Sequence, residues 1–319
     1  MSWNILNTMD LSGAPEAVEA LEVVGTLVSL PAERELVLER ISEFDAYLAS
    51  ASVRIDKEFL DKATRLRLIG SPSTGTDHMD LDEIRTHGVE CYDIAKEFDL
   101  INGFTATSEM AFGLLISLIR GIIPAAQDAS QGVWSREQYT GFQLHQKTMG
   151  ILGLGRLGKI TARIAQGFGM RVISHDIADV SAPGVEMVDF ETLLRDADVL
   201  SIHIHLKPET DGLIDAGCFE KMKSKALILN TSRGRIIKED DLLQALKTKQ
   251  IAGAGLDVID GEWLSEDELF KHPLVEYARE NNNLIIVPHI GGATLESIYG
   301  ARVFMARRIA DYLQTIDKA

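Results

Sequence analysis

The chain has 319 residues, enough for a large core and, as a first expectation, for two domains. Hydrophobic residues make up 45% and charged residues 25%, which is the balance of a globular protein. The net charge of −16 argues against a nucleic-acid partner and against binding to an anionic membrane.

The sequence gives no sign of a disulfide framework, a targeting segment or a membrane span. Cys91 and Cys218 are too few for a framework and lack metal-ligand spacing, so we expect two small buried side chains. No apolar run is long enough to cross a bilayer, and residues 1–10 do not read as a signal peptide. A cytoplasmic location is the expectation that follows.

The first third of the chain alternates short apolar runs with helical patterns, which predicts a parallel sheet. Strands are expected at residues 20–28, 46–49, 66–70 and 88–92, and helices at 33–42 and 56–63. A long helix is expected from Thr105 to Ile119. It is apolar on most of its faces, so we expect it to be buried, with a second subunit as a candidate cover.

A second alternation begins at Thr148. Strands are expected at residues 149–152, 171–174, 199–203, 226–230, 251–256 and 284–287. Helical patterns fit between most of them, and the number of strands suits a complete Rossmann domain. A last helix, at residues 294–316, follows the final strand and is therefore a candidate to return to the first domain.

A glycine-rich loop lies where the second alternation starts. It contains Gly153, Gly155 and Gly158, with Arg156 and Leu157 between them, and it joins an apolar strand to a helical stretch. Such glycines permit a tight turn and let the backbone approach a pyrophosphate, whose charge the helix N-terminus receives. The sequence therefore predicts a dinucleotide-binding loop.

An acidic residue favours NAD as the dinucleotide. Asp176 follows the next expected strand, about 20 residues past the loop, where a carboxylate binds the ribose 2′-hydroxyl. Residues 177–179 supply no arginine for a 2′-phosphate, which disfavours NADP. The alternative for Asp176 is a solvated side chain at a strand end.

Five ordered blocks, at residues 70–80, 150–176, 197–214, 229–257 and 288–294, resemble the D-isomer-specific 2-hydroxyacid dehydrogenases. The resemblance covers nearly the whole chain. It implies an α/β fold in which a Rossmann NAD-binding domain, residues 102–290, is inserted in a smaller flavodoxin-like parallel-sheet domain. The smaller substrate-binding (catalytic) domain is then discontinuous, with residues 1–101 and 291–319. The resemblance also implies a homodimer, with contacts from the long helix and the segment through Trp134.

The resemblance assigns a catalytic set of Arg233, Glu262 and His289. Arg233 would bind the substrate carboxylate and carbonyl oxygen, a task that suits a planar guanidinium. His289 would be the general acid/base, because a histidine adopts both proton states near neutrality. Glu262 would orient His289 and favour its protonated form. The family usually has proline where Trp263 stands, and Asp260 is an alternative to Glu262.

Further positions are assigned to the cofactor by the same resemblance. Asp257 would accept from the nicotinamide carboxamide. The remaining positions are Ile204, His205, Thr231, Ser232, Gly291 and Gly292. Proline commonly stands where His205 is. His203 and His205 alternate, but without Cys, Asp or Glu at ligand spacing we expect no metal site.

Residues 73–78 resemble the substrate loop of the family's first domain, and the resemblance implies that they bind the substrate. Backbone N–H groups of Thr74 and Gly75, next to Ser73, would hold its carboxylate, as such turns commonly hold anions. His78 is expected to brace this loop. Relatives that act on 3-phosphoglycerate tend to carry arginine where Ser71 stands.

These residues together favour an NAD-dependent enzyme that interconverts a small-molecule 2-oxo acid and a D-2-hydroxy acid. Three alternatives stay open: an NAD(H)-sensing binding module without significant turnover, a 3-phosphoglycerate dehydrogenase-type enzyme, and a dehydrogenase of an unusual substrate such as a sugar acid or phosphonate.

Overall fold

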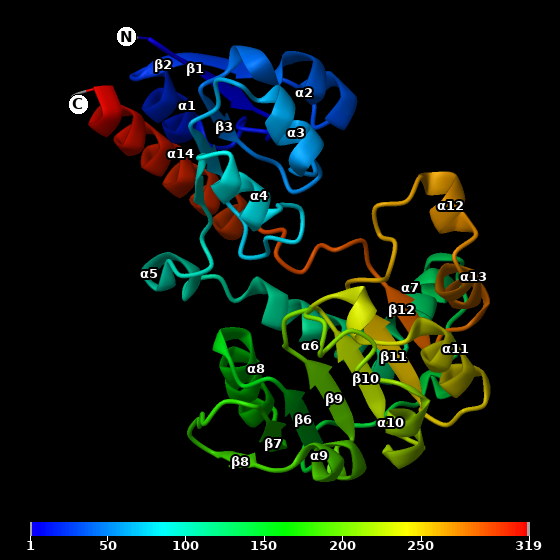
Figure 1. The fold of residues 1–319 in the computed structure, drawn as a ribbon. Helices are drawn as coiled ribbons and strands as arrows, with labels where there is room; N and C mark the ends of the chain where they lie inside the picture. The colour runs from blue at the N-terminus through cyan, green and yellow to red at the C-terminus, as the bar shows by residue number, and fades with distance from the viewer. Residues whose placement is uncertain (1, 318–319) are drawn as a thin grey trace. The chain divides into compact units, whose positions relative to one another are not determined.

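The structure, a computed structural model, describes residues 2–317 and divides the chain into two compact units (Figure 1). The first unit joins the chain up to Phe104 with the chain from Ala293 onward. The second unit is the continuous segment Thr105–Gly292.

The first unit is built on a five-stranded parallel sheet with the strand order β2-β1-β3-β4-β5. This is the order of flavodoxin-like sheets. The strands are β1 Trp3–Asn7, β2 Gly25–Ser29, β3 Ala46–Leu48, β4 Leu68–Gly70 and β5 Glu90–Tyr92. The helices are α1 Pro15–Glu22, α2 Arg34–Arg40, α3 Lys57–Lys62, α4 Leu81–Thr86, α5 Phe98–Ile101 and α14 Leu295–Asp317.

Both faces of this sheet are covered. Side chains of α1, α5 and α14 form one apolar cluster with alternate strand residues, and side chains of α2, α3 and α4 form another with the remaining ones. The long last helix α14 packs beside α1 and on β3 and β4, so the two ends of the chain fold together in this unit. Figure 1 shows α14, in red, running beside the blue N-terminal elements.

The expected strand at residues 20–28 is partly wrong, because residues 20–22 close the helix α1. Pro15 begins this helix, and Ala17 and Leu21 place a fully buried apolar stripe against α14. Only Gly25–Ser29 is a strand. Two short strands were not expected from the sequence: β1, and Val185–Met187 in the second unit.

The second unit is built on a seven-stranded parallel sheet with the order β12-β11-β10-β9-β6-β7-β8. The strands are β6 Thr148–Leu152, β7 Arg171–His175, β8 Val185–Met187, β9 Val199–Ile202, β10 Leu227–Asn230, β11 Gly253–Leu256 and β12 Leu284–Ile286. Counted from β6, this is the Rossmann order 3-2-1-4-5-6 with one more strand at the edge. The predicted doubly wound α/β fold is confirmed in both sheets.

Helices cover both faces of the second sheet as well. The helices of this unit are α6 Ala106–Arg120, α7 Ile122–Ser130, α8 Arg156–Gly167, α9 Phe190–Asp196, α10 Ala216–Lys221, α11 Glu239–Lys247, α12 Glu266–Phe270 and α13 Pro273–Glu280, of which α7 buries no residue. The helix expected from Thr105 needs no second subunit for its burial, because α6 packs on α8 and on β10, β11 and β12 of its own unit.

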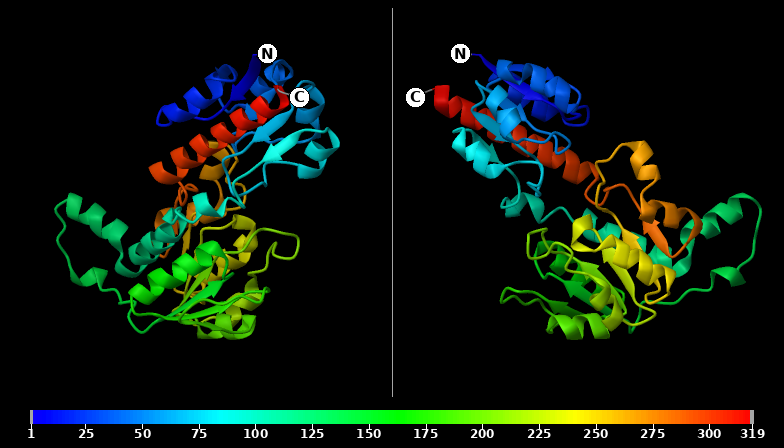
Figure 2. Two further views of the ribbon diagram at one scale, coloured as in Figure 1. Left: turned by 90° about the vertical axis from the view of Figure 1, so that its left-hand side faces the viewer. Right: turned by 45° about the vertical axis from the view of Figure 1, so that its right-hand side comes forward.

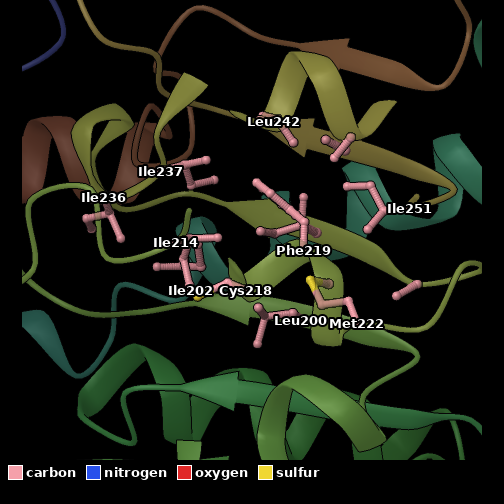
Figure 3. Packing of buried hydrophobic residues seen from close by; sticks show 14 of the residues in the cluster. Leu200, Ile202, Ile214, Cys218, Phe219, Met222, Ile236, Ile237, Leu242 and Ile251 are labelled. Carbon is pink, nitrogen blue, oxygen red and sulfur yellow. The ribbon is translucent and has the colours of Figure 1, made fainter. Parts of the chain in front are cut away.

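The opposite face carries the cluster in Figure 3, where Phe219 of α10 lies at the centre of labelled aliphatic side chains. Ile236 and Ile237, which follow Arg233, belong to this cluster, as does Leu242 of α11. The core therefore fixes the segment that follows Arg233.

Among the described residues no single helix is long and apolar enough to cross a membrane. One bent pair, Phe98–Arg120 with Ile122–Ser130, meets that test of length and composition when its two parts are taken together.

We predict that Phe219→Ala destabilises the protein by about 3–5 kcal/mol, because the side chain is fully buried and its removal leaves a cavity. Guanidinium unfolding followed by circular dichroism measures the change. Ile177→Ala is the matched control; Ile177 is 96% exposed, so its loss should change stability by less than about 0.5 kcal/mol. Equal midpoints for the two variants would contradict the packing described here.

Candidate active site

The glycine loop after β6 is shaped by close backbone approaches. Gly153 has a φ of 93°, and a Cβ there would lie 2.6 Å from the carbonyl oxygen of His203. A Cβ on Gly158 would lie 2.1 Å from the carbonyl oxygen of Gly153. Neither position can hold a side chain without moving the backbone, so both glycines are structural requirements of the turn.

Gly155 differs, because a Cβ there would meet nothing within 4 Å. This open space lies at the N-terminus of α8, where Gly155 is the N-cap and Arg156 the first helical residue. The first N–H groups of a helix have no partner within it, and they carry the positive end of the helix dipole. The loop therefore offers room and N–H donors for a phosphate group. Arg156 and Leu157 are half-buried beside it.

Asp176 lies at the end of β7 and faces this loop. Its Oδ2 accepts the N–H of Leu154 at 2.7 Å, and its Oδ1 accepts the N–H of Ala178 at 2.8 Å. A carboxylate has about four lone-pair sites, so acceptor capacity remains for hydroxyl groups of a ribose. The carboxylate is thus held in place by the same loop that would bind the pyrophosphate.

The segment after β9 places its two histidines differently. His203 is half-buried, its Nε2 lies 2.8 Å from Oγ of Ser201, and burial of the ring lowers its pKa to about 4. The ring is therefore neutral at physiological pH. His205 is exposed, and its carbonyl oxygen accepts the hydroxyl of Thr210 at 2.7 Å. Ile204 lies between them and contacts the glycine loop, since its Cγ2 would be 2.7 Å from a Cβ on Gly153.

Thr231, Ser232 and Arg233 follow β10 in a cross-braced turn. The side chain of Asn230 accepts the N–H of Ser232 at 3.0 Å and donates to the carbonyl of Arg233 at 2.8 Å. The hydroxyl of Ser232 donates to the carbonyl of Ile202, which ties β10 to β9. Oγ1 of Thr231 is buried without a hydrogen-bond partner, so it is an orphaned polar atom that a bound group could satisfy.

The guanidinium of Arg233 extends from this turn. Its Nη1 donates to the carbonyl of Ser232 at 2.7 Å, and the side chain is half-buried. The positive charge of Arg233 acts to lower the pKa of His289. A cation and a titratable ring are therefore close enough to interact.

Asp257, at the end of β11, fixes the backbone around His289. Its carboxylate accepts the N–H of Ile290 at 2.8 Å and that of Gly291 at 2.9 Å. Its own carbonyl accepts the N–H of His289 at 2.8 Å. Asp257 is 1% exposed, and burial raises the pKa of its carboxyl. Gly292, the residue after Gly291, is the last residue of the second unit.

Glu262 and His289 form a direct pair. Nδ1 of His289 lies 3.0 Å from both carboxylate oxygens of Glu262, and the two side chains are 37% and 18% exposed. The hydrogen bond to Glu262 raises the pKa of His289 from its usual 6.5, while partial burial opposes the rise. Because Nδ1 carries the proton that Glu262 accepts, Nε2 is the ring atom left to exchange a proton with a ligand.

Asp260 and Trp263 are two further residues near this pair. Asp260, the alternative partner considered for His289, is exposed, and its N–H donates to Glu239 at 2.7 Å. Trp263 is 68% exposed, and its ring centroid lies 6.5 Å from that of His289 with 47° between the planes. An indole thus stands beside the ring of His289, at the position where the resemblance implied proline.

The loop after β4 in the first unit is held by its own hydroxyl groups. Oγ of Ser71 lies 2.9 Å from Oγ of Ser73 and 3.1 Å from Nε2 of His78. The hydroxyl of Ser73 donates to the carbonyl of Gly75 at 2.7 Å, which shapes the turn at Thr74. His78 therefore contacts the loop as a brace would.

Sequence patterns missed one buried contact beside the glycine loop. Ser108 of α6 is fully buried, and its hydroxyl donates to the carbonyl of Leu157 at 3.1 Å. A serine within an apolar helix was the only available signal, and it does not say which carbonyl the hydroxyl would reach.

Comparisons with known proteins match both units to one family. A family model described as "D-isomer specific 2-hydroxyacid dehydrogenase, NAD binding domain" matches residues 112–291. A second, described as the catalytic domain of the same enzymes, matches residues 6–96.

Individual relatives agree with these models. A glyoxylate reductase of Thermococcus litoralis is 34% identical over 287 residues, covering 86% of this chain and 82% of the relative. A D-3-phosphoglycerate dehydrogenase of Synechocystis is 32% identical over 87% of this chain, which spans only 48% of that relative. The solved structure of the TT0316 protein from Thermus thermophilus has a TM-score of 0.84 and 31% identity, covering 99% of this chain and 97% of that one.

We predict that Glu262→Gln lowers the pKa of His289 by about one unit, because the neutral amide no longer stabilises the imidazolium. NMR titration of the histidine ring protons measures it, with His289→Gln to assign the signal. Glu266→Gln, an exposed substitution on α12, is the control and should leave the value unchanged. An unshifted pKa in Glu262→Gln would contradict the pairing.

Proposed function

Since the chain belongs to the D-isomer-specific 2-hydroxyacid dehydrogenase family, we propose that it interconverts a 2-oxo acid and a D-2-hydroxy acid with His289 as the general acid/base. Family membership makes the protein an oxidoreductase with NAD as its cofactor. The proton-transfer role and the identity of the acid go further than that membership.

The pairing of His289 with Glu262 is the observation that carries the proposal. In the reducing direction the protonated ring donates from Nε2 to the developing alkoxide, and Glu262 stabilises the imidazolium beforehand. In the oxidising direction the neutral ring accepts the proton of the hydroxyl group. Because Glu262 raises the pKa of His289, the reducing activity should persist to a higher pH and fall as the pH rises through that pKa.

The residues of the second unit fit a bound NAD. The open space at Gly155 and the N-terminus of α8 suit the pyrophosphate, and Asp176 suits the ribose hydroxyls. The orphaned hydroxyl of Thr231 is a further polar group available to the cofactor. When bound, NADH supplies the hydride that reduces the carbonyl carbon. Ile204, His205, Ser232, Asp257, Gly291 and Gly292 complete the proposed set.

Two groups are proposed to hold the substrate. The guanidinium of Arg233 binds the carboxylate and carbonyl oxygen and stabilises negative charge on that oxygen. Backbone N–H groups of Thr74 and Gly75, in the turn shaped by Ser73, bind the carboxylate. Several relatives are named glyoxylate reductases, so glyoxylate is the first substrate to test.

We predict that the protein oxidises NADH in the presence of a 2-oxo acid and that His289→Ala lowers kcat by about 10²–10⁴-fold. Absorbance at the NADH band measures turnover with glyoxylate, hydroxypyruvate, pyruvate, phenylpyruvate, 2-oxoglutarate and 3-phosphohydroxypyruvate. NADH affinity, measured by fluorescence, should be nearly the same in the variant and the parent.

The variant and the panel separate two failures. A His289→Ala protein that retains most of its kcat would exclude the proton-transfer role. Silence of the parent across the panel, with NADH still binding, would exclude these 2-oxo acids as substrates and direct the search to sugar acids and phosphonates.

We further propose that the protein is a homodimer joined through α7 and the segment that follows it. None of the residues of α7 is buried, and Figure 2 shows this helix extending away from the sheet of its unit. Large apolar side chains are exposed along this stretch: Ile122, Ile123, Val133, Trp134 and Phe142. A second copy of the chain, packed by two-fold symmetry, would cover them.

Light scattering should give twice the mass of one chain at micromolar concentration. Trp134→Glu should lower the measured mass toward that of one chain, because the indole is 89% exposed in the single chain and would be buried in the dimer. Ile177→Glu, a charge introduced at another exposed apolar residue, is the control. A parent protein with the mass of one chain would exclude the dimer.

A further inference from the structure

A further histidine–carboxylate pair, in the second unit, lies next to the turn that carries Glu262. Glu239 is the first residue of α11, and His272 is the N-cap of α13. Nε2 of His272 lies 3.1 Å from Oε2 of Glu239, and the side chains are only 11% and 17% exposed. The proposed reaction uses neither residue, so the presence of two nearly buried ionisable groups needs another explanation.

The hydrogen bonds around His272 fix the position of its proton. Nδ1 accepts the backbone N–H of Leu274 at 3.3 Å, and a backbone N–H can only donate. Nδ1 therefore carries a lone pair, and the ring proton is on Nε2, which donates it to Glu239. The N-terminus of α13 is thereby connected through a neutral imidazole to the carboxylate of Glu239.

The other oxygen of Glu239 reaches the turn that carries Glu262. Oε1 accepts the N–H of Asp260 at 2.7 Å. The chain then continues through Gly261, whose φ of 77° makes the bend, to Glu262. The hydrogen bond thus fixes the backbone two residues before the carboxylate that contacts His289.

Gly234, which follows Arg233, also lies close to this turn. A Cβ on Gly234 would lie 2.1 Å from the carbonyl carbon of Ile259 and 2.3 Å from the nitrogen of Asp260. The turn is therefore contacted both by this backbone and by the side chain of Glu239. Leu242 anchors α11, and with it Glu239, in the core cluster seen in Figure 3.

We propose that Glu239 and His272 are positioning residues that keep Glu262 on Nδ1 of His289. The hydrogen bonds run from the N-terminus of α13 through His272 and Glu239 to the N–H of Asp260. We call this series of hydrogen bonds the relay. The same α13 leads into β12, the strand that precedes His289, so both Glu262 and His289 are connected to the relay. The role rests on the proposed function, because it serves the pair that would transfer the proton.

Other charged groups face the relay across a cavity of about 470 Å³. Arg235 pairs with Asp211, and Nζ of Lys238 lies 3.9 Å from Asp215, so both cations have acidic partners of their own. The remaining lining acids are Asp240 and Asp260. Burial raises the pKa of the Glu239 carboxyl, and the N–H of Asp260 together with His272 opposes that rise.

The test measures His289 directly in the protein without ligands. In Glu239→Ala the N–H of Asp260 and Nε2–H of His272 lose their acceptor, so the turn loosens and Glu262 leaves His289. We expect the pKa of His289 to fall by about one unit in an NMR titration. Asp240→Asn removes a neighbouring charge on the same helix and the same cavity wall, and should leave the value unchanged.

Glu239→Gln keeps an oxygen for the N–H of Asp260 but turns an N–H₂ group toward His272, so an intermediate fall in the pKa of His289 is expected. This variant provides the test if Glu239→Ala does not fold. His272→Phe should shift the pKa in the same direction, and the double variant Glu239→Ala/His272→Phe no further, because the two residues act as one unit. A lowered Tm with an unshifted His289 pKa in these variants would overturn the proposal and leave the pair a purely structural one.

Kinetics separates this inference from the proposed function. With an active 2-oxo acid, Glu239→Ala should lower kcat about tenfold at alkaline pH, move the alkaline fall of kcat to lower pH, and leave NADH affinity unchanged. A parent protein that reduces no 2-oxo acid refutes the proposed function alone, since the titration of His289 still shows whether Glu239 positions Glu262. Unchanged pH profiles in an active Glu239→Ala enzyme refute the positioning role alone.

Discussion

The buried carboxylate of Asp257 is the group on which the arrangement of the reactive histidine depends. His289 has a φ of 51°, a left-handed conformation that costs a residue with a side chain about 1–2 kcal/mol. The carboxylate of Asp257 accepts the N–H groups of Ile290 and Gly291, the two residues that follow His289. Hydrogen bonds to a charged group contribute about 1.5–3 kcal/mol each, so two of them outweigh the strain. In this conformation the ring contacts Glu262.

The parallel sheet of the second unit explains why the functional groups occur at intervals along the chain yet meet in space. The glycine loop follows β6, Asp176 follows β7, Arg233 follows β10, and Asp257 and His289 follow β11 and β12. Strands that run in one direction end at one edge, and the change of strand order between β6 and β9 opens that edge to a ligand. The loops contribute different groups: backbone N–H donors after β6, a carboxylate after β7, a guanidinium after β10, and Glu262 and His289 after β11 and β12.

Opposing charges set the state of the reactive pair. Glu262 raises the pKa of His289, whereas partial burial and Arg233 lower it. The outcome depends on the geometry of one hydrogen bond, so whatever holds the turn at residues 257–262 also controls the protonation of the ring. The turn is held by three elements: β11, which precedes it, the backbone at Gly234, and Glu239. At 37% exposure the ring remains accessible to a substrate that this support does not touch.

The sequence alone determined the fold class and the family, because both are written in local patterns, and its resemblance to that family supplied the residues proposed for catalysis. Alternating apolar runs predicted most strands of both sheets, though not β1 and β8, and the spacing of Gly153, Gly155 and Gly158 before a helix predicted the phosphate loop. The tertiary structure alone decided which groups touch. Residues 20–22 became helix because α14, nearly 300 positions away, covers Ala17 and Leu21. The pair of Glu239 and His272 could not be predicted, because nothing local states that α11 and α13 bring these two side chains together. Contacts between distant segments depend on the packing of the whole unit, which no short stretch of sequence contains.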